Sequence, residues 1–408
     1  MNAPVSFAPG GASEARPSKA PGAAACIRHD RFLIPLAPPA LLRFYLDHLL
    51  VPHSRGEFLR SGLARTIGPV AALLDGQSCD QAAEFPLAEL AALLRREGVL
   101  HGKISAITLG DYENSARKKS VAFLFEGREP RPRLIAKLSS DPAHSHNLEH
   151  EYRALGLLRE RLGDAQRETV PAPMTKGSAR GTAVFCQQVL PGTAMYVQTR
   201  SSWLPRRLVQ CHFGLAGDWL TQFQQATRSG EIRLGESGSA EALAALQQVA
   251  SLAPQAADFI TAAIRRTEAL ADVRLPVVAV HGDFWTRNLL LSGAQLGVID
   301  WENYHEQGLP FDDLFHFITS YGQSFPWQLG RWSDPVRAFR ATFAAPGWMS
   351  RFVQQAVRRH CLHSGMSPLL PAALFPAFLA RRALEHGGIW LSLFDEFSRM
   401  DPCACFGS

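Results

Sequence analysis

An apolar run in the C-terminal half of the chain leads directly into a group of polar residues. The run is Leu275–Val280, and the residues that follow it, His281–Asn288, read HGDFWTRN. A short apolar run bounded by polar residues is typical of a buried strand. Polar side chains placed just after such a strand either form a turn or take part in a reaction. A His-Gly-Asp sequence alone most often marks a turn, so its neighbours must decide between the two.

The spacing of the polar residues around this run favours a reaction. Asn288 follows Asp283 with four residues between them, which is the spacing in the catalytic loop of protein kinases. The next apolar run, Leu296–Ile299, ends at Asp300, where a protein kinase places a metal-binding aspartate. Two carboxylates and an amide oxygen form a hard oxygen site that suits Mg²⁺. Phosphoryl transfer needs this set, because one carboxylate takes a proton while the other ligands hold metal ions at the nucleotide phosphates.

A lysine and a glutamate upstream provide an independent test of this interpretation. A kinase-like site needs an ammonium group on a strand, near the nucleotide phosphates, and an acid on the next helix that holds it in place. Lys137 lies in a predicted strand, and the helix predicted after it carries Glu149 and Glu151. We expect Glu151 to be the partner, because it lies four residues before Leu155 and so shares the helix face that packs on the sheet.

Four motifs together resemble the aminoglycoside phosphotransferase and choline kinase family, whose members are small-molecule kinases with a protein-kinase-like fold. They are His281–Asn288, Val298–Glu302, the hinge-like Phe185–Gly192 and Pro310–Leu314, and the resemblance covers residues 101–395. It implies a two-lobed α+β fold with a small β-rich N-terminal lobe and a larger, mainly helical C-terminal lobe. It also implies ATP- or GTP-dependent phosphoryl transfer to a hydroxyl of a small molecule, such as an aminoglycoside, an amino alcohol or a sugar.

The resemblance assigns a role to each residue of the predicted site. Asp283 is expected to be the catalytic base, and Asn288 and Asp300 are expected to bind Mg²⁺. Lys137 would hold the phosphates of the nucleotide, with Glu151 as its partner. The expected cofactors are therefore Mg²⁺ and the co-substrate ATP or GTP.

Two further parts of the nucleotide site are expected in the N-terminal lobe. The backbone near Gln187 and Val189, in the hinge-like segment, would receive the adenine. The loop that covers the phosphates is expected at Leu109–Arg117, which contains a single glycine. Phosphate contacts in this loop would come from the backbone and from Ser115.

Changes of composition and period divide the chain into four regions. Residues 1–28 are expected to form a disordered tail, because they are rich in Ala, Pro, Gly and Ser and have few bulky apolar side chains. Residues 29–100 contain apolar residues three and four apart, which predicts an N-terminal helical extension. Short β-prone runs predict a kinase-like N-terminal lobe over residues 101–190, and mostly helical patterns predict a C-terminal lobe over residues 191–400.

The composition argues against several other classes of protein. The net charge is +5 and the Lys and Arg residues are scattered, so we expect no nucleic-acid partner. No apolar run is long enough to span a membrane and the N-terminus lacks a secretion signal, so we expect a cytoplasmic protein without a membrane partner. The seven cysteines lack metal-ligand spacing, apart from Cys403 and Cys405, and are expected to be reduced. The oligomeric state stays open.

Two alternatives remain beside an active phosphotransferase. A catalytically weak nucleotide-binding regulatory protein, or pseudokinase, would share the scaffold, but the base, both metal ligands and the lysine are all present. A metal-dependent hydrolase that uses His281 would need more His or carboxylate ligands than this segment offers. The acceptor is not identified by the sequence. An acidic pocket would indicate an amine, and a neutral pocket would indicate a sugar or another alcohol.

Other residues close to the motifs are expected to be structural. Trp285 and Trp301 flank the site and are expected to pack rather than to stack on a substrate. Asp312 and Asp313 begin a predicted helix, where a carboxylate caps the helix or compensates its dipole.

Overall fold

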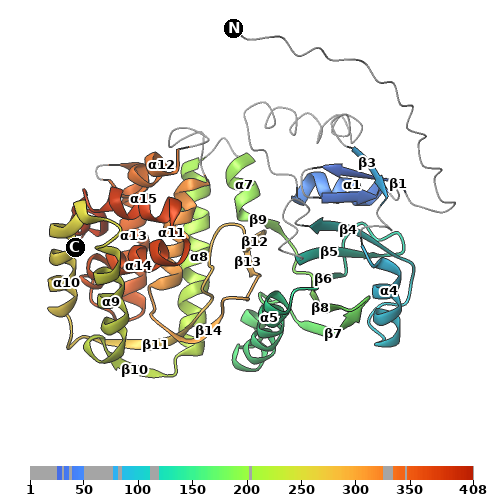
Figure 1. Ribbon diagram of the computed structural model, residues 1–408, viewed down its shortest axis with the longest axis horizontal. Helices are drawn as coiled ribbons and strands as arrows, with labels where there is room; N and C mark the ends of the chain where they lie inside the picture. Colours follow the sequence, from blue (N-terminus) through green and yellow to red (C-terminus); the bar gives the residue numbers. More distant parts are fainter. Residues whose placement is uncertain are drawn as a thin grey trace, which may run out of the picture.

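The molecule has two lobes (Figure 1). In the computed structural model, the N-terminal lobe is a β-sheet with helices on its faces, and the C-terminal lobe is mainly helical. The predicted two-lobed α+β architecture is therefore confirmed. The described residues are 25–29, 32–35, 39–49, 77–80, 85–110, 119–201, 205–324, 334–344 and 347–407.

An eight-stranded antiparallel sheet forms the N-terminal lobe, with the strand order β3-β1-β2-β4-β5-β6-β8-β7. Its central strands β4, β5 and β6 are the β-prone runs of the sequence, and β6 is buried along its whole length. Strand β7 has mostly exposed side chains because it lies at an edge of the sheet. The strands are β1 (Ala25–His29), β2 (Phe32–Pro35), β3 (Gln77–Asp80), β4 (Ile104–Gly110), β5 (Lys119–Glu126), β6 (Leu134–Ser139), β7 (Pro173–Ala179) and β8 (Thr182–Gln188).

The structure corrects the prediction that residues before 101 form only a helical extension. Helices α1 (Pro39–Phe44) and α4 (Leu87–Arg96) are present as expected, and a further helical turn, η1 (Tyr45–Leu49), follows α1. However, β2 and β3 also lie in this region, and β2 pairs with β4, so the region extends the sheet. A four-residue apolar run has no distinguishable period, and pairing with β1 on one side and β4 on the other makes it a strand. Of the predicted disordered tail, residues 1–24 lie outside the described residues, and residues 25–28 belong to β1.

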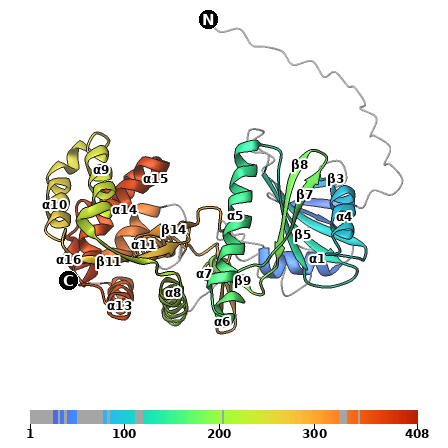
Figure 2. The same ribbon diagram turned by 90° about the horizontal axis from the view of Figure 1, so that it is seen from below.

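Helices cover both faces of the sheet, and Figure 2 shows α4 and α5 (Pro142–Arg161) on opposite sides of it. Helix α4 packs its buried Leu90 in the same cluster as Ala106 of β4. The next residue of β4, Ile107, points to the opposite face and packs in a cluster with Leu41 of α1. Helix α5 covers the strands β6 and β8. The helix that follows β6 therefore lies against the face from which the lysine of β6 projects.

The C-terminal lobe is built mostly from helices, and its strands form two small three-stranded sheets, β10-β11-β14 and β13-β12-β9. No helix among the described residues is both long and apolar enough to cross a membrane. The longer helices are α7 (Met195–Ser201), α8 (Pro205–Thr227), α9 (Ser239–Val249), α10 (Ala257–Glu268), α11 (Asp312–Gln323), α12 (Pro335–Phe343), α13 (Trp348–His363), α14 (Leu370–His386) and α15 (Gly388–Phe397). The short helical segments are α6 (Asp164–Arg167), η3 (Leu234–Gly238), η4 (Pro254–Ala256) and α16 (Pro402–Phe406). The strands are β9 (Thr193–Ala194), β10 (Gly230–Arg233), β11 (Arg274–Val280), β12 (Leu289–Ser292), β13 (Gln295–Val298) and β14 (His305–Gly308).

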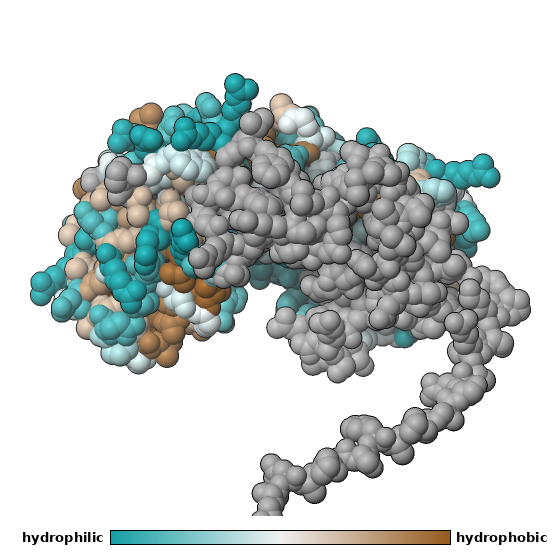
Figure 3. Space-filling view, turned by 90° about the horizontal axis from the view of Figure 1, so that it is seen from above, coloured by the Kyte–Doolittle hydropathy of each residue, from teal (hydrophilic) through white to brown (hydrophobic). Residues whose placement is uncertain are grey.

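Aromatic side chains form the core beneath the polar motifs. Trp219 of α8 stacks on Phe284, with ring centroids 5.5 Å apart, and on Phe223, with centroids 5.0 Å apart. Trp301 is fully buried against Phe223. Phe284 and Trp301 belong to the two loops that carry the polar motifs, so these ring contacts anchor both loops on α8. On the outside, Figure 3 shows apolar residues, in brown, among hydrophilic ones on the surface of the C-terminal lobe at the left.

The two lobes are connected by the chain at Pro191–Gly192 and by a side-chain contact beside it. Gly192 has φ +123°, and a Cβ atom there would lie 2.7 Å from the carbonyl oxygen of Leu291, so only glycine fits this approach. Nδ1 of His48, in η1, lies 2.8 Å from Oγ1 of Thr193, the first residue of β9. Because β9 pairs with β12, this hydrogen bond links the N-terminal segment to the C-terminal lobe.

Candidate active site

Two loops of the C-terminal lobe carry the predicted acids and the predicted amide. Residues 281–288 join β11 to β12, and residues 299–304 join β13 to β14. Strands β12 and β13 form a hairpin in which Leu289 lies opposite Val298, so both loops meet at the same end of it. The backbone N–H of Ile299, just after β13, donates to the carbonyl oxygen of Asn288, just before β12, at 3.0 Å. This hydrogen bond holds the two loops together.

The side-chain amide of Asn288 is held by Asp283, the acid of the same predicted motif. Its Nδ2 donates to Oδ2 of Asp283 at 2.9 Å and to the backbone carbonyl of the same residue at 3.0 Å. The donor end of the amide is thereby turned to Asp283, which leaves the carbonyl oxygen Oδ1 as the atom suited to a metal ion. The predicted neighbourhood of Asp283 and Asn288 is present in the structure.

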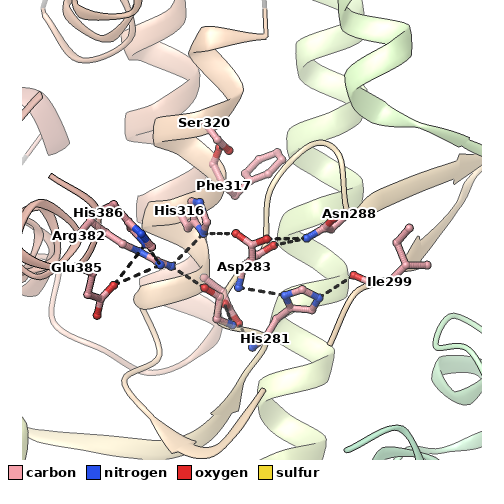
Figure 4. Close-up of polar contacts among 12 residues, drawn as sticks. His281, Asp283, Asn288, Ile299, His316, Phe317, Ser320, Arg382, Glu385 and His386 are labelled. Carbon is pink, nitrogen blue, oxygen red and sulfur yellow. Dashed lines mark hydrogen bonds and ion pairs between the residues drawn. The ribbon is translucent and has the colours of Figure 1, made fainter. Parts of the chain in front are cut away.

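Asp283 lies in an environment that favours its protonated form. Burial and, next, the nearby charge of Asp300 raise the pKa of its carboxyl to about 6, against the opposite effects of Arg382 and Asn288. Nδ1 of His316 lies 3.6 Å from Oδ1 of Asp283 (Figure 4). Burial keeps the pKa of His316 well below its ordinary value, so this imidazole is neutral and the contact is not an ion pair. A carboxylate with a raised pKa is suited to accept a proton close to neutral pH.

The predicted lysine contacts carboxylates of both lobes. Nζ of Lys137 lies 2.7 Å from each carboxylate oxygen of Glu151 and 2.6 Å from Oδ1 of Asp300. Burial alone would lower the pKa of Lys137, but the carboxylates of Asp300 and Glu151 raise it above its ordinary value, so the ammonium stays charged. Glu149, the other acid considered from the sequence, makes an exposed pair with Lys176 at 3.3 Å. The predicted contact of Lys137 with Glu151 is therefore present, and it extends across the lobes to Asp300.

Asp300 adopts an uncommon backbone conformation. Its φ of +69° lies in the left-handed region, where residues other than glycine are rarely found and where Asp and Asn are the best tolerated. The backbone N–H of the next residue, Trp301, donates to Oε1 of Glu151 at 3.3 Å. The loop is thus tied to the same glutamate that holds Lys137. Backbone strain kept in place by surrounding contacts is characteristic of functional sites.

His281 connects the two loops and does not face a reactant. It is fully buried, its Nδ1 accepts from the backbone N–H of Asp283 at 3.1 Å, and its Nε2 lies 3.0 Å from the carbonyl oxygen of Ile299. Burial lowers the pKa of His281 to about 4, so the imidazole is neutral, with Nε2 as the donor. It therefore positions both loops.

Asp313 holds the backbone of the first loop. Its two carboxylate oxygens accept from the N–H groups of His281 and Gly282, at 2.8 and 2.9 Å. Neither Asp312 nor Asp313 caps α11 with a side-chain hydrogen bond, although both lie in its first turn. Asp312 instead pairs with Arg381 at 2.5 Å. Asp312 and Asp313 were expected to cap the helix or to compensate its dipole. The contact of Asp313 with the loop was not expected.

Arg382 is a residue of the site that sequence reasoning missed. From α14, its Nη2 donates to the carbonyl oxygen of Gly282 at 2.6 Å and lies 3.1 Å from Nδ1 of His316 (Figure 4). Arg382 and Asp313 thus hold the same short piece of backbone, one through a carbonyl and the other through N–H groups. No spacing in the sequence could have revealed this contact, because 100 residues separate Arg382 from Gly282.

The residues predicted to receive the nucleotide base lie at the end of the N-terminal sheet. Gln187 is buried in β8, and Val189 is half-buried just beyond the end of that strand. Ser115 and most of the predicted phosphate-covering loop lie outside the described residues, since positions 111–118 are not among them. The adenine and phosphate contacts of these residues stay predictions.

The two tryptophans near the motifs differ in their surroundings. Trp301 packs in the aromatic core, as expected, and its Nε1 donates to the carbonyl of Val298 at 3.0 Å. Trp285 is half-buried and lines a cavity beside Asp283, so its expected packing role stays a prediction. Within the described ranges, no group of three or more His, Cys, Asp or Glu residues could hold a metal ion. The hydrolase alternative therefore lacks a ligand set in this part of the chain.

Comparison with known proteins gives one family and a set of distant structures. No curated protein matches the chain in sequence. Residues 118–348, more than half of the chain, match the model of the phosphotransferase enzyme family. Matching solved structures include a thermostable mutant of aminoglycoside phosphotransferase APH(4)-Ia with AMP-PNP and hygromycin B, at 14% identity, 79% coverage of this chain and 99% of that chain, and a TM-score of 0.47. Amicoumacin kinase hAmiN with AMP-PNP, Ca²⁺ and Ami matches at 15% identity, with 78% and 95% coverage and a TM-score of 0.46. The aminoglycoside phosphotransferase APH(3'')-Id from Streptomyces rimosus matches at 14% identity, with 76% and 98% coverage and a TM-score of 0.41.

Proposed function

We propose that this chain, which belongs to the phosphotransferase enzyme family, is an active kinase that moves the γ-phosphoryl group of ATP or GTP to a hydroxyl of a small molecule. One observation supports the proposal above all. Groups from distant parts of the sequence meet at one site, where Asn288 donates to Asp283 and Lys137 reaches Asp300 from the other lobe. Phosphoryl transfer depends mainly on positioning and charge, and this set supplies both.

Asp283 would act on the acceptor. With its pKa raised to about 6, its carboxylate is a competent proton acceptor for a hydroxyl placed within hydrogen-bond distance. The hydroxyl oxygen forms a bond to the γ-phosphorus while the bond from that phosphorus to the β,γ-bridging oxygen breaks. The hydroxyl proton passes to Asp283, and the electron pair of the broken bond leaves on the nucleoside diphosphate. Asn288 and the backbone around Gly282 keep the carboxylate in place during the reaction.

Lys137 would contact the phosphates of the nucleotide, and Asn288 and Asp300 would hold its metal ion. A carboxylate and an amide oxygen are the hard ligands that Mg²⁺ prefers, so the chemistry of Asp300 and Asn288 fits this ion. When bound, Mg²⁺ would supply positive charge that offsets the charge of the phosphates. Lys137 is held charged by Glu151 and Asp300, so its ammonium is ready for the phosphate oxygens. The pseudokinase alternative is less well supported, since the proposed base Asp283, the proposed metal ligands Asn288 and Asp300 and the lysine Lys137 lie together.

The first prediction is that a nucleotide with Mg²⁺ stabilises the protein. A ligand that binds only the folded state should add about 2.7 kcal/mol to the free energy of unfolding at a hundredfold excess over its Kd. The melting temperature should therefore rise with millimolar ATP or GTP in the presence of Mg²⁺, and the rise should shrink when EDTA removes the metal ion. If neither nucleotide shifts the melting temperature with metal present, the proposed function is wrong.

The second prediction concerns Lys137. Lys137→Ala removes a charge-assisted contact to the phosphates, which is worth about 1.5–3 kcal/mol, so turnover should fall about 10- to 100-fold. Lys176→Ala is the matched control, because Lys176 also pairs with a glutamate of α5 but is exposed. Steady-state ATP consumption measures both variants, and circular dichroism checks that each is folded. Equal losses in the two variants, or none in Lys137→Ala, would show that another cation holds the phosphates.

A further inference from the structure

A cavity of about 270 Å³ opens directly beside Asp283. Its walls come from α11, α14 and α15 and from the loop that carries Asp283 itself. The apolar part of the lining consists of Trp285, Ile389, Trp390 and Leu393. Its volume lies near the lower end of the range of about 300–1,000 Å³ that is usual for small-molecule sites. A molecule bound there would be small and would lie against aromatic and aliphatic surfaces.

The charges around this cavity do not suit a cationic ligand. Among the described residues that line it, Asp283 is the single carboxylate, and the catalytic role proposed for Asp283 requires it to face a hydroxyl. Arg382 brings a positive charge into the lining. The His316 imidazole, also in the lining, is neutral. An ammonium group in this cavity would therefore find no lining carboxylate other than Asp283 among the described residues, and it would approach a guanidinium group of like charge.

The positive charge of Arg382 is not evidence for an anionic ligand either, because the guanidinium group already has partners within the protein. Its Nη2 already donates to the carbonyl of Gly282, and its Nη1 lies 3.6 Å from Oε2 of Glu385. The guanidinium also lies over the rings of Phe378 and Trp390, with 5.7 and 5.9 Å from Cζ to the ring centroids. These contacts hold the guanidinium group in place as part of the lining, and Figure 4 shows Arg382 beside Glu385 and His316.

We propose that the acceptor of this site is an uncharged alcohol with an apolar ring body, and that the site discriminates against alcohols that carry ammonium groups. The proposal rests on the proposed function, since it assumes that the acceptor hydroxyl meets Asp283. The ring body would lie against Trp285 and Trp390, and its hydroxyl would point to the carboxylate. A polycationic aminoglycoside is the wrong chemistry for this lining, because its several ammonium groups would find one carboxylate.

Two phenyl glycosides that differ in one group test this proposal. Phenyl β-D-glucopyranoside is uncharged, and phenyl β-D-glucosaminide carries an ammonium group in place of one hydroxyl. Their binding is followed through tryptophan fluorescence with Mg²⁺ and AMP-PNP present, because Trp285 and Trp390 line the cavity. We expect the uncharged glycoside to bind at least about tenfold more tightly than its cationic counterpart. Equal or tighter binding of the cationic glycoside overturns the proposal, and so does an absence of binding by both.

A carboxylate introduced into the lining of the cavity provides a second test of the proposal. Ile389 lines the cavity and is 40% exposed, so Ile389→Asp adds a carboxylate there without burying it. This variant should reduce or reverse the preference for the uncharged glycoside. Leu369→Asp is the matched control, because Leu369 is also exposed, at 52%, but does not line the cavity. If both variants keep the wild-type preference, the wall does not select for charge and the proposal fails.

The same samples separate this proposal from the function on which it rests. The melting temperature with Mg²⁺ and AMP-PNP reports on nucleotide binding alone. If the nucleotide does not stabilise the protein, the proposed function fails and the acceptor class fails with it. If the nucleotide stabilises the protein but the cationic glycoside binds more tightly, only the inference about the acceptor is wrong.

Discussion

Replacement of Asp283 by Asn is expected to lower kcat by about 10²- to 10⁴-fold, the usual loss when a general base is removed. The amide has nearly the shape of the carboxylate but cannot accept the proton of the attacking hydroxyl. Asp283 contacts Asn288 but not Lys137, so the nucleotide should still bind with most of its affinity. Single-turnover kinetics and calorimetric titration with MgATP measure the two effects separately.

Asp300→Asn is the matched comparison for this prediction. Asn tolerates the left-handed conformation that Asp300 adopts, with φ +69°, so the loop should keep its shape. The substitution removes the negative charge that faces Lys137 and that would hold the metal ion, so MgATP binding should weaken together with turnover. Loss of nucleotide binding in Asp283→Asn, with binding and turnover both kept in Asp300→Asn, would show that the two roles have been assigned wrongly.

A second large effect is expected from a single methyl group in the same loop. Gly282 has φ +79°, and a Cβ atom there would lie 2.2 Å from the backbone oxygen of Asn303. Gly282→Ala should therefore lower the free energy of unfolding by a few kcal/mol, from about 1–2 kcal/mol for the backbone conformation and about 1–3 kcal/mol for the clash. The loop must also move, and a shift of about 1 Å at a reacting group costs about 10²-fold in rate.

Gly293→Ala separates backbone conformation from the clash. Gly293 also has a positive φ, +60°, but a Cβ atom there would meet nothing within 4 Å. This variant should lose about 1–2 kcal/mol and keep its activity, because its turn lies at the end of the β12–β13 hairpin opposite to the loop of Asp283. Urea unfolding and turnover are measured for both. Similar values for the two variants would mean that the contact of Gly282 with Asn303 does not set the position of the loop.

The part of the site that could be predicted from the sequence is the part set by local spacing. Asp283 and Asn288 lie in the loop that leads into the hairpin of β12 and β13, and Asp300 follows that hairpin, so their separation along the chain already places them near one another. Glu151 could be chosen over Glu149 because the period of a helix decides which of them faces the sheet, and the pairing of Glu149 with Lys176 outside the site agrees with this. In each case a short-range geometric rule was enough.

The residues that could not be predicted come from helices far away in the sequence. Arg382 and His316 reach the loop only because α14 and α11 pack beside it, and no periodic pattern marks either residue. The N-terminal strands were missed for a related reason. The four residues of β2 have no clear pattern of their own, and they become a strand by pairing along their whole length with β1 and over two residues with β4, which lies about 70 residues further along.

The contacts between the lobes also set how the molecule can move. The pair of Lys137 and Asp300 joins β6 of the N-terminal lobe to the loop after β13 of the C-terminal lobe, so any separation of these two elements lengthens it. A divalent cation competes with the Lys137 ammonium for the same carboxylate. Metal binding at Asp300 would therefore be coupled to this contact between the lobes.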